Sequence, residues 1–326
     1  MRQQNPPSPK ASAGRRKKIL ITGAGGYVGS TIAAILKDDY EVVGFGHPPS
    51  LKATEGQVAR IIKGDIADYK ALSRAAKGVY AIIHTASPTK ESWCKEHPYE
   101  ALRAIVYGAR NVRHAAEEHK VPLVVHFSTQ AVYSNFAKRP LPLREDMELQ
   151  PDTFYGSLKA IAEHELLEPC LLKTKDYRLK TVIIRPANIY GVGAGVLRRN
   201  VVSTFAENAR NGKPLIVSGD GKQKVDFVHV RDIARLVKLI LAKPAPKKTF
   251  VLNAGSGAPT AIKTIAQIIL KVQKQNKKKP PEIISQPVPA GTIAADRWLS
   301  IAKAKKLYNW KPEITLERGV KELLQE

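Results

Sequence analysis

The feature that most constrains this chain is a glycine-rich stretch at residues 18–30, KILITGAGGYVGS. The apolar run ILI near its start predicts a short buried strand of a parallel sheet. Gly23, Gly26 and Gly29 follow at fixed spacing, and a helical pattern begins soon after them. A strand, a glycine turn and a helix in this order can bind a pyrophosphate at the helix N-terminus. The motif alone is weak evidence, because a glycine turn can also bind nothing.

Each of the three glycines has its own expected role in such a motif. Gly23 would make the tight turn, and Gly26 would let the backbone approach the phosphates. Gly29 would let the helix lie close to the strand.

Apolar strands and helical patterns alternate through the first half of the chain. Further strands are expected at residues 41–45, 59–66, 79–85, 121–128 and 180–185. The two longest helical patterns cover residues 98–119 and 154–172. This alternation predicts an α/β fold, a Rossmann-type doubly wound parallel sheet with helices on both faces. The second half mixes short strands and helices, one of them capped by Asp232, which predicts a smaller mixed α/β C-terminal substrate domain.

The same pattern divides the chain into domains. Residues 1–17 are rich in Pro, Ser, Arg and Lys and predict a disordered basic tail. Residues 18–190, joined by residues 226–254, are assigned to the dinucleotide-binding domain. Residues 191–225 and 255–326 are assigned to the substrate-binding domain.

Composition restricts the class of protein. No stretch approaches the roughly 20 apolar residues that span a bilayer, and the tail has no apolar segment typical of a secretory signal. Cys94 and Cys170 are the two cysteines, far apart and without metal-ligand spacing. Free thiols in a reducing compartment are therefore expected. We expect a cytoplasmic protein that binds no membrane and no metal.

The net charge of +24 at pH 7 comes partly from the tail and from two lysine-rich stretches, residues 243–248 and 274–279. Neither stretch carries interleaved aromatic side chains, which disfavours nucleic-acid binding. A basic surface would instead attract anionic nucleotide substrates.

A tyrosine and a lysine four residues apart, Tyr155 and Lys159, fall near the start of a predicted helix. Residues at this spacing share one helix face. An ammonium group beside a phenol favours the phenolate and lowers the pKa of the phenol. Thr129 stands at the end of a predicted strand and could hold a substrate alcohol against that phenol. A Tyr–Lys pair is often only a surface pair, but its position after a glycine turn favours a catalytic interpretation.

The ends of three predicted strands bear on the cofactor. An acidic side chain usually bonds the adenosine ribose of NAD at the end of the second strand, but here Gly46 and His47 follow that strand. No arginine stands there for the extra phosphate of NADP. Asp65 could accept a hydrogen bond from the adenine amino group or cap the helix that starts near Tyr69. His84, at the end of the fourth strand, is expected to be structural.

The chain resembles the extended short-chain dehydrogenases/reductases, and more narrowly their nucleotide-sugar epimerase/dehydratase branch. The resemblance runs from residue 18 to about residue 324. The motifs that carry it are, in order, TGAGGYVGS, GDI, HTAS, STQAVY, YGSLK, RPANIYG, GDGKQKVDFVHVRDIA and AKAKKLYNWKP.

The resemblance implies a role for each matching residue. Tyr155 would be the general acid/base, Lys159 would bond the nicotinamide ribose and Thr129 would hold the substrate hydroxyl. Asn188 would lie near the substrate phosphates. The implied cofactor-binding residues are Gly23, Gly26, Tyr27, Val28, Gly29, Asp65, Ile66, Ala86, Tyr155, Lys159 and Pro186. Relatives pair two long helices into a dimer, here residues 101–116 and 160–172, so a homodimer is expected.

Two departures from the family pattern bear on the reaction. Gln130 and Ala131 follow Thr129 where dehydratases carry Asp-Glu, which disfavours dehydration. Val225 stands where the family places an arginine on the sugar-nucleotide phosphates, as in members similar to 3β-hydroxysteroid dehydrogenases. Arg297 could replace that arginine as a substrate-binding residue, with residues 198–199 as further candidates.

The resemblance implies an enzyme, an NAD(P)-dependent nucleotide-sugar epimerase similar to UDP-glucose 4-epimerase. The expected cofactor is NAD, with NADP left open, and the expected partner is a small-molecule substrate. One alternative is a dehydrogenase or reductase on a non-nucleotide alcohol or ketone, which Val225 favours. The other is a non-enzymatic dinucleotide-sensing protein of the same fold.

Overall fold

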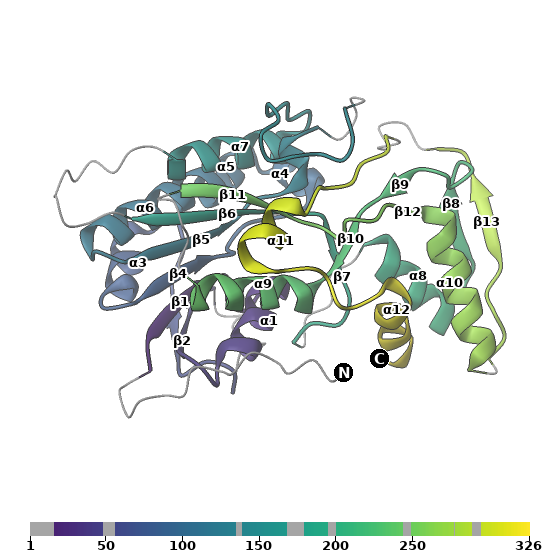
Figure 1. Cartoon of the computed structure of the whole chain (residues 1–326), viewed down its shortest axis with the longest axis horizontal. Coiled ribbons are helices and arrows are strands. Elements are labelled where there is room, and N and C mark those ends of the chain that lie inside the picture. Colours follow the sequence, from purple (N-terminus) through teal and green to yellow (C-terminus); the bar gives the residue numbers. More distant parts are fainter. Residues whose placement is uncertain are drawn as a thin grey trace.

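A parallel sheet forms the centre of the structure, a computed structural model (Figure 1). The structure describes residues 16–47, 56–134, 139–167, 179–194, 200–243, 249–276, 278–288 and 295–326. Within these ranges the sheet has seven strands in the order β11-β6-β5-β4-β1-β2-β3, and every neighbouring pair is parallel. The strands are β1 (Lys18–Thr22), β2 (Glu41–Gly46), β3 (Arg60–Lys63), β4 (Ala81–His84), β5 (Leu123–Phe127), β6 (Lys180–Pro186) and β11 (Thr249–Ala254).

Helices cover both faces of the sheet because its strands are apolar on both sides. Ile19 and Ile21 of β1 belong to one buried core, and Leu20 between them belongs to the other. The first core includes side chains of α1 (Tyr27–Leu36), α9 (Val230–Ala242) and α11 (Ala302–Tyr308). The second includes side chains of α3 (Tyr69–Ala76), α4 (Glu91–Glu96), α5 (Pro98–Leu102), η2 (Arg103–Tyr107), α6 (Gly108–Glu118) and α7 (Phe154–Leu167).

A smaller lobe with its own buried core lies at one end of the molecule (Figure 1). Its helices are α8 (Val201–Arg210), α10 (Ile262–Gln275) and α12 (Leu316–Gln325). Short strand pairs join the lobe and border the sheet: β7 (Asn188–Tyr190) with β10 (Phe227–His229), β8 (Leu215–Ser218) with β13 (Ile283–Gln286), and β9 (Lys224–Val225) with β12 (Thr260–Ala261). The predicted fold class, a doubly wound parallel sheet with a smaller mixed α/β lobe, is confirmed.

The strand order places a crevice at the carboxyl edge of the sheet. The chain leaves β1 toward β2 on one side, whereas β4 pairs with β1 on the other. At such a switch point the connections diverge, and ligands of doubly wound folds bind there. The glycine turn follows β1 at this edge. The strands β4, β5 and β6 end at the same edge, because they are parallel to β1.

Two local expectations differ from the structure. The helical pattern at residues 98–119 is interrupted by the π-helical turn η2. The cap of α9 is His229, whose Nδ1 accepts the backbone N–H of Arg231 at 3.2 Å, so the assignment to Asp232 is wrong. Asp232 lies in the first turn, and its carboxylate accepts the backbone N–H groups of Glu313 and Ile314, both at 3.0 Å.

Across the described ranges, no helix has the length and apolar character needed to cross a membrane.

Candidate active site

A pocket at the carboxyl edge of the sheet is lined by all three predicted catalytic residues. Its wall comes from the start of α1, the ends of β5 and β6, and the first turns of α7. The predicted residues that line it are Val28, Thr129, Tyr155, Lys159, Pro186 and Asn188. Residues far apart in the sequence are therefore brought together where the strand order predicts a ligand.

The glycine turn leaves room for backbone at the start of α1. Gly23 has φ +69°, a conformation that side chains disfavour. A Cβ at residue 29 would lie 2.3 Å from the Gly23 carbonyl oxygen, so only glycine lets α1 approach the turn. Gly26 is the N-cap of α1, and no side chain caps that end. The turn and the N–H groups of this first helical turn therefore fit the pyrophosphate of a dinucleotide.

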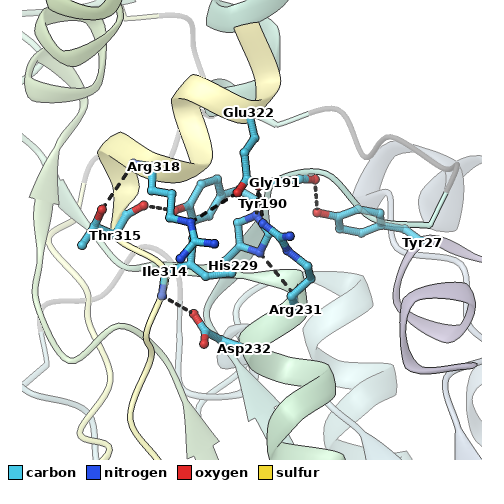
Figure 2. Close-up of polar contacts among 10 residues, drawn as sticks. All are labelled: Tyr27, Tyr190, Gly191, His229, Arg231, Asp232, Ile314, Thr315, Arg318 and Glu322. Atoms are coloured by element: carbon cyan, nitrogen blue, oxygen red, sulfur yellow. Dashed lines mark hydrogen bonds and ion pairs between the residues drawn. The ribbon is translucent and has the colours of Figure 1, made fainter. Parts of the chain in front are cut away.

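The side chain of Tyr27, the first residue of α1, points away from this turn and holds the helix in place. Its hydroxyl donates to the carbonyl oxygen of Gly191 at 2.6 Å. Gly191 has φ +98°, and a Cβ there would lie 2.1 Å from Nε2 of His229. Figure 2 shows that His229 in turn faces Glu322 of α12, with Nε2 and Oε2 separated by 3.6 Å. Because the Tyr27 side chain is directed to Gly191, its backbone N–H is the group that could take part in cofactor binding.

The loop after β4 packs against the glycine turn. The residues after β3, Asp65 and Ile66, are not among the residues that line the pocket. A Cβ at Gly23 would lie 2.7 Å from the backbone of Ala86. Ile66 is buried, and its carbonyl oxygen accepts from Asn111 at 3.0 Å. The carboxylate of Asp65 accepts the backbone N–H of Ala67 at 2.9 Å.

The alternative assignment of Asp65 as a helix cap is wrong. The N-cap of α3 is Asp68, whose carboxylate accepts the backbone N–H of Ala71 at 3.1 Å. Asp65 lies one turn too early to reach the first free N–H groups of that helix.

Lys159 is buried in the pocket wall with 3% of its surface exposed. Its Nζ donates to the carbonyl oxygen of Phe127 at 2.8 Å and lies 6.0 Å from the ring centroid of Tyr155. Burial lowers the pKa of Lys159 to about 8, although the nearby Glu163 carboxylate acts in the opposite direction. Lys159 is thus a positive charge held one helical turn from the phenol.

Two buried histidines, His84 and His126, have lowered pKa values. Burial and the Lys159 charge lower the pKa of His84 to about 3 and hold the pKa of His126 well below its usual range. Nδ1 of His84 lies 2.7 Å from the Thr22 hydroxyl, which agrees with the structural role expected for His84.

Thr129 stands at the end of β5, on the pocket side of the short 3₁₀ turn η3 (Gln130–Val132). Its hydroxyl oxygen accepts the backbone N–H of Ala131 at 3.2 Å. The hydroxyl hydrogen can still be donated, since a threonine hydroxyl both donates and accepts.

A buried ion pair beneath the pocket was not predicted from the sequence. Arg185 and Glu163 form two hydrogen bonds of 2.9 and 2.6 Å. The Ser128 hydroxyl donates to Glu163 at 2.5 Å, and Arg185 also donates to the Tyr133 hydroxyl at 2.8 Å. This network fixes the residues that precede Thr129 and Pro186. The sequence offers one local indication of this network: Glu163 lies four residues after Lys159, so both fall on the same face of α7.

The predicted substrate-binding residues lie at the border of the lobe. The side-chain amide of Asn188 donates to the carbonyl oxygen of Asp226 at 3.1 Å. Val225, the preceding residue, forms a parallel bridge with Arg297. Burial lowers the pKa of Arg297 while the Asp152 carboxylate opposes this shift. Residues 198–199 lie outside the described residues.

In the ranges that the structure describes, no group of three or more His, Cys, Asp or Glu side chains is placed to hold a metal ion.

A doubly wound sheet with a glycine turn at its switch point, and a Tyr–Lys pair on α7 in the pocket at the same edge, is typical of dinucleotide-binding α/β proteins. The chain belongs to the NAD dependent epimerase/dehydratase family, since the model of that family matches residues 19–255. This confirms the resemblance, and the family description names the predicted cofactor, NAD.

Relatives with different activities match nearly the whole chain. A 2-alkyl-3-oxoalkanoate reductase of Stenotrophomonas maltophilia (strain K279a) is 28% identical, with 94% of this chain and 98% of the relative covered. A putative UDP-glucose 4-epimerase of Methanocaldococcus jannaschii is also 28% identical, with coverages of 94% and 97%.

The fold is shared with solved structures. One example is the UDP-glucose-4-epimerase from Stenotrophomonas maltophila with bound NAD and formylated UDP-arabinopyranose. It has a TM-score of 0.82 and 21% identity, over 95% of this chain and 97% of that one.

Proposed function

We propose that this chain is an NAD-dependent nucleotide-sugar epimerase similar to UDP-glucose 4-epimerase. The observation that carries the proposal is the bridge between Val225 and Arg297. It supports a phosphate-binding guanidinium beside the position that holds an arginine in the resembling family. A planar fork of donors suits phosphate oxygens, which a valine cannot bind.

In this proposal each pocket residue has one task. Tyr155 takes the proton of the sugar hydroxyl and later returns it. The Lys159 charge lowers the pKa of that phenol, and the Thr129 hydroxyl holds the sugar hydroxyl at the strand end. Asn188 lies on the side toward Arg297, where the nucleotide diphosphate would bind. Bound NAD would take a hydride from the sugar carbon and return it to the opposite face.

We also propose NAD rather than NADP as the preferred cofactor. The strand β2 ends in Gly46 and is followed by His47, so neither a carboxylate for a ribose diol nor an arginine for a phosphate follows it. A single histidine is a poor permanent phosphate partner near neutral pH. Calorimetric titration of the protein with both dinucleotides tests this, and tighter NADP binding that is lost in His47→Ala contradicts it.

A homodimer is proposed from an exposed apolar surface on two helical segments. Tyr107, Ile161 and Leu167 are between 40% and 46% exposed. They lie on η2 and α7, within residues 101–116 and 160–172, the segments that the family resemblance assigns to a dimer. A symmetric dimer would bury the same patch on both subunits.

A reductase on a non-nucleotide ketone is the second candidate. Val225 is buried in the apolar core of the lobe with 7% of its surface exposed, so this part of the site is less polar than a diphosphate requires. The reductase relative named above supports the same candidate.

Product analysis separates the two candidates. The protein is incubated with UDP-glucose and a catalytic amount of NAD, and the sugar is analysed by NMR. Epimerisation predicts a new sugar stereoisomer without net accumulation of NADH. Net NADH formation, or turnover of a 3-oxo acid with NADH but of no UDP-sugar, favours the reductase.

A further inference from the structure

The helix that carries Tyr155 is capped by a residue from a distant part of the chain. Glu91 is the first residue of α4, and its two carboxylate oxygens each accept one backbone N–H of α7. Oε1 accepts from Phe154 at 3.0 Å, and Oε2 accepts from Tyr155 itself at 2.9 Å. The next backbone N–H, that of Gly156, donates to the Thr153 hydroxyl oxygen at 3.1 Å. Two side chains of different origin thus share the cap of α7.

The Glu91 cap is charged and also forms an ion pair with Lys95 of its own helix, with Oε1 and Nζ 3.3 Å apart. Its hydrogen bonds are charge-assisted, and a carboxylate at a helix N-terminus interacts favourably with the helix dipole. A bidentate carboxylate also fixes orientation as well as distance, because both oxygens are engaged. Rotation or translation of the first turn of α7 would break at least one of the two bonds.

The position of α4 gives this cap a functional meaning. The helix α4 begins directly after the loop that follows β4. Thr85, Ser87 and Thr89 of that loop line the same pocket as Tyr155. Glu91 therefore ties the pocket-lining loop to the residue proposed as the acid/base. Thr153, by contrast, directly precedes α7, and in the part of the chain that the structure describes its hydrogen bonds are to Gly156 and Ser157 of that helix.

We propose that Glu91 is a positioning residue for Tyr155: its carboxylate sets the place of the phenol relative to the loop after β4. The inference rests on the proposed acid/base role of Tyr155. A displacement of about 1 Å at a reacting group can lower the rate on the order of 100-fold. Substitution of Glu91 should therefore affect the chemical step more than the binding of substrate or NAD.

The chain offers matched variants for the test. Glu91→Gln keeps the shape of the side chain but turns an NH₂ group toward one of the two N–H donors. Thr153→Val removes the other cap of the same helix without touching the Tyr155 N–H. Glu96→Gln removes an exposed charge from the same helix α4. Glu91→Asp keeps the charge on a shorter side chain and serves if Glu91→Gln does not fold.

The measurements are kcat and KM on the substrate that the wild type turns over, NAD affinity by calorimetry, and Tm. We expect Glu91→Gln to lower kcat about 10- to 100-fold, with KM and NAD affinity within about twofold of wild type. Thr153→Val should lower Tm to a similar degree but keep most of kcat, and Glu96→Gln should behave as wild type.

Two results overturn the inference. One is a Glu91→Gln variant with wild-type kcat. The other is a loss of kcat that is equal in Glu91→Gln and Thr153→Val and follows Tm. Tyr155→Phe, measured in parallel, separates these failures from a failure of the proposed function. If Tyr155→Phe stays active, the acid/base assignment itself is wrong; if it is inactive while Glu91→Gln is active, only the positioning role is wrong.

Discussion

Val225 and Arg297 lie side by side in a parallel bridge, although they are 72 positions apart in the sequence. The backbone N–H of Arg297 donates to the carbonyl oxygen of Lys224 at 2.9 Å, which fixes the register of the pair. The resembling family carries an arginine where this chain has Val225. The bridge therefore brings the backbone of an arginine from elsewhere in the chain to the same border of the lobe.

Substitution of Arg297 should reveal the class of substrate. If the substrate is a nucleotide sugar, Arg297→Ala removes a charge-assisted contact worth roughly 1.5 to 3 kcal/mol, and the Kd for UDP should rise about ten- to a hundredfold. The loss should fall on binding rather than on kcat, because the contact is remote from the reacting carbon. Calorimetry with UDP and dTDP measures it, with Lys224→Ala, a neighbouring exposed cation, as control. A wild type that binds neither nucleotide would favour the reductase.

Tyr155→Phe tests the acid/base assignment. The substitution removes one hydroxyl and leaves the ring in place against the second core. General acid/base catalysis typically contributes on the order of 10² to 10⁴ in rate, so kcat should fall by that factor while NAD affinity stays nearly unchanged. Wild-type turnover in this variant, at equal folded concentration, contradicts the assignment.

Lys159→Met should abolish activity and yet stabilise the fold at neutral pH. Folding lowers the pKa of Lys159 from 10.5 to about 8, so the folded state disfavours the charged ammonium. Each pKa unit corresponds to about 1.4 kcal/mol, and the lost bond to the Phe127 carbonyl offsets part of the gain. We expect a net gain on the order of 1 kcal/mol.

The pH dependence of this gain follows from the same shift. Below pH 8 the lysine is charged in both states, and the penalty in the wild type is fully present. Between about pH 8 and 10.5 the folded wild type loses the proton, so the penalty disappears as the pH rises. Tm measured at pH 7 and pH 10 should therefore show a larger advantage of Lys159→Met at pH 7. An equal advantage at both pH values contradicts the buried-charge explanation.

Much of the sheet could be predicted from the sequence because buried parallel strands are continuous apolar runs. The pairing of Tyr155 and Lys159 could also be predicted from the sequence, because a four-residue spacing on a helix is a local property. The Asp232 assignment failed because its carboxylate binds Glu313 and Ile314, about 80 residues further along the chain. A sequence pattern gives the capping preference of a residue but not the distant donors that compete for it.

The supporting residues of the pocket were missed for the same reason. Glu91 accepts hydrogen bonds from Phe154 and Tyr155, which lie 63 and 64 positions further along the chain. It belongs to a short helix that no strong hydrophobic periodicity in the sequence predicts. Arg185 pairs with Glu163 across two elements of the fold. These contacts depend on the packing of α4, α7 and β6, and only the assembled structure brings them together.

Tyr27→Phe should weaken dinucleotide binding without touching the glycines. The variant leaves the Gly191 carbonyl oxygen without the donor that now lies 2.6 Å away. A buried group that loses its partner costs about 1 to 3 kcal/mol, and α1 should become less firmly held at its first turn. We expect a lower Tm and a several-fold weaker NAD affinity, measured by calorimetry. A lower Tm with unchanged NAD affinity would mean that Tyr27 serves the fold alone.

The proposed dimer predicts a monomer when one exposed apolar side chain becomes charged. Ile161 is 46% exposed on α7, and Leu167 and Tyr107 are further exposed apolar side chains of the segments proposed for the dimer. A stable interface buries about 1,200 to 2,000 Å² with few charges at its centre, so Ile161→Arg would place like charges opposite each other across the symmetry axis. Val288→Arg is the matched control, because Val288 is 48% exposed and lies far along the chain in the lobe segment.

Light scattering at micromolar concentration should give a dimer for wild type and Val288→Arg and a monomer for Ile161→Arg. A monomeric wild type contradicts the dimer, and a dimeric Ile161→Arg variant places the interface elsewhere.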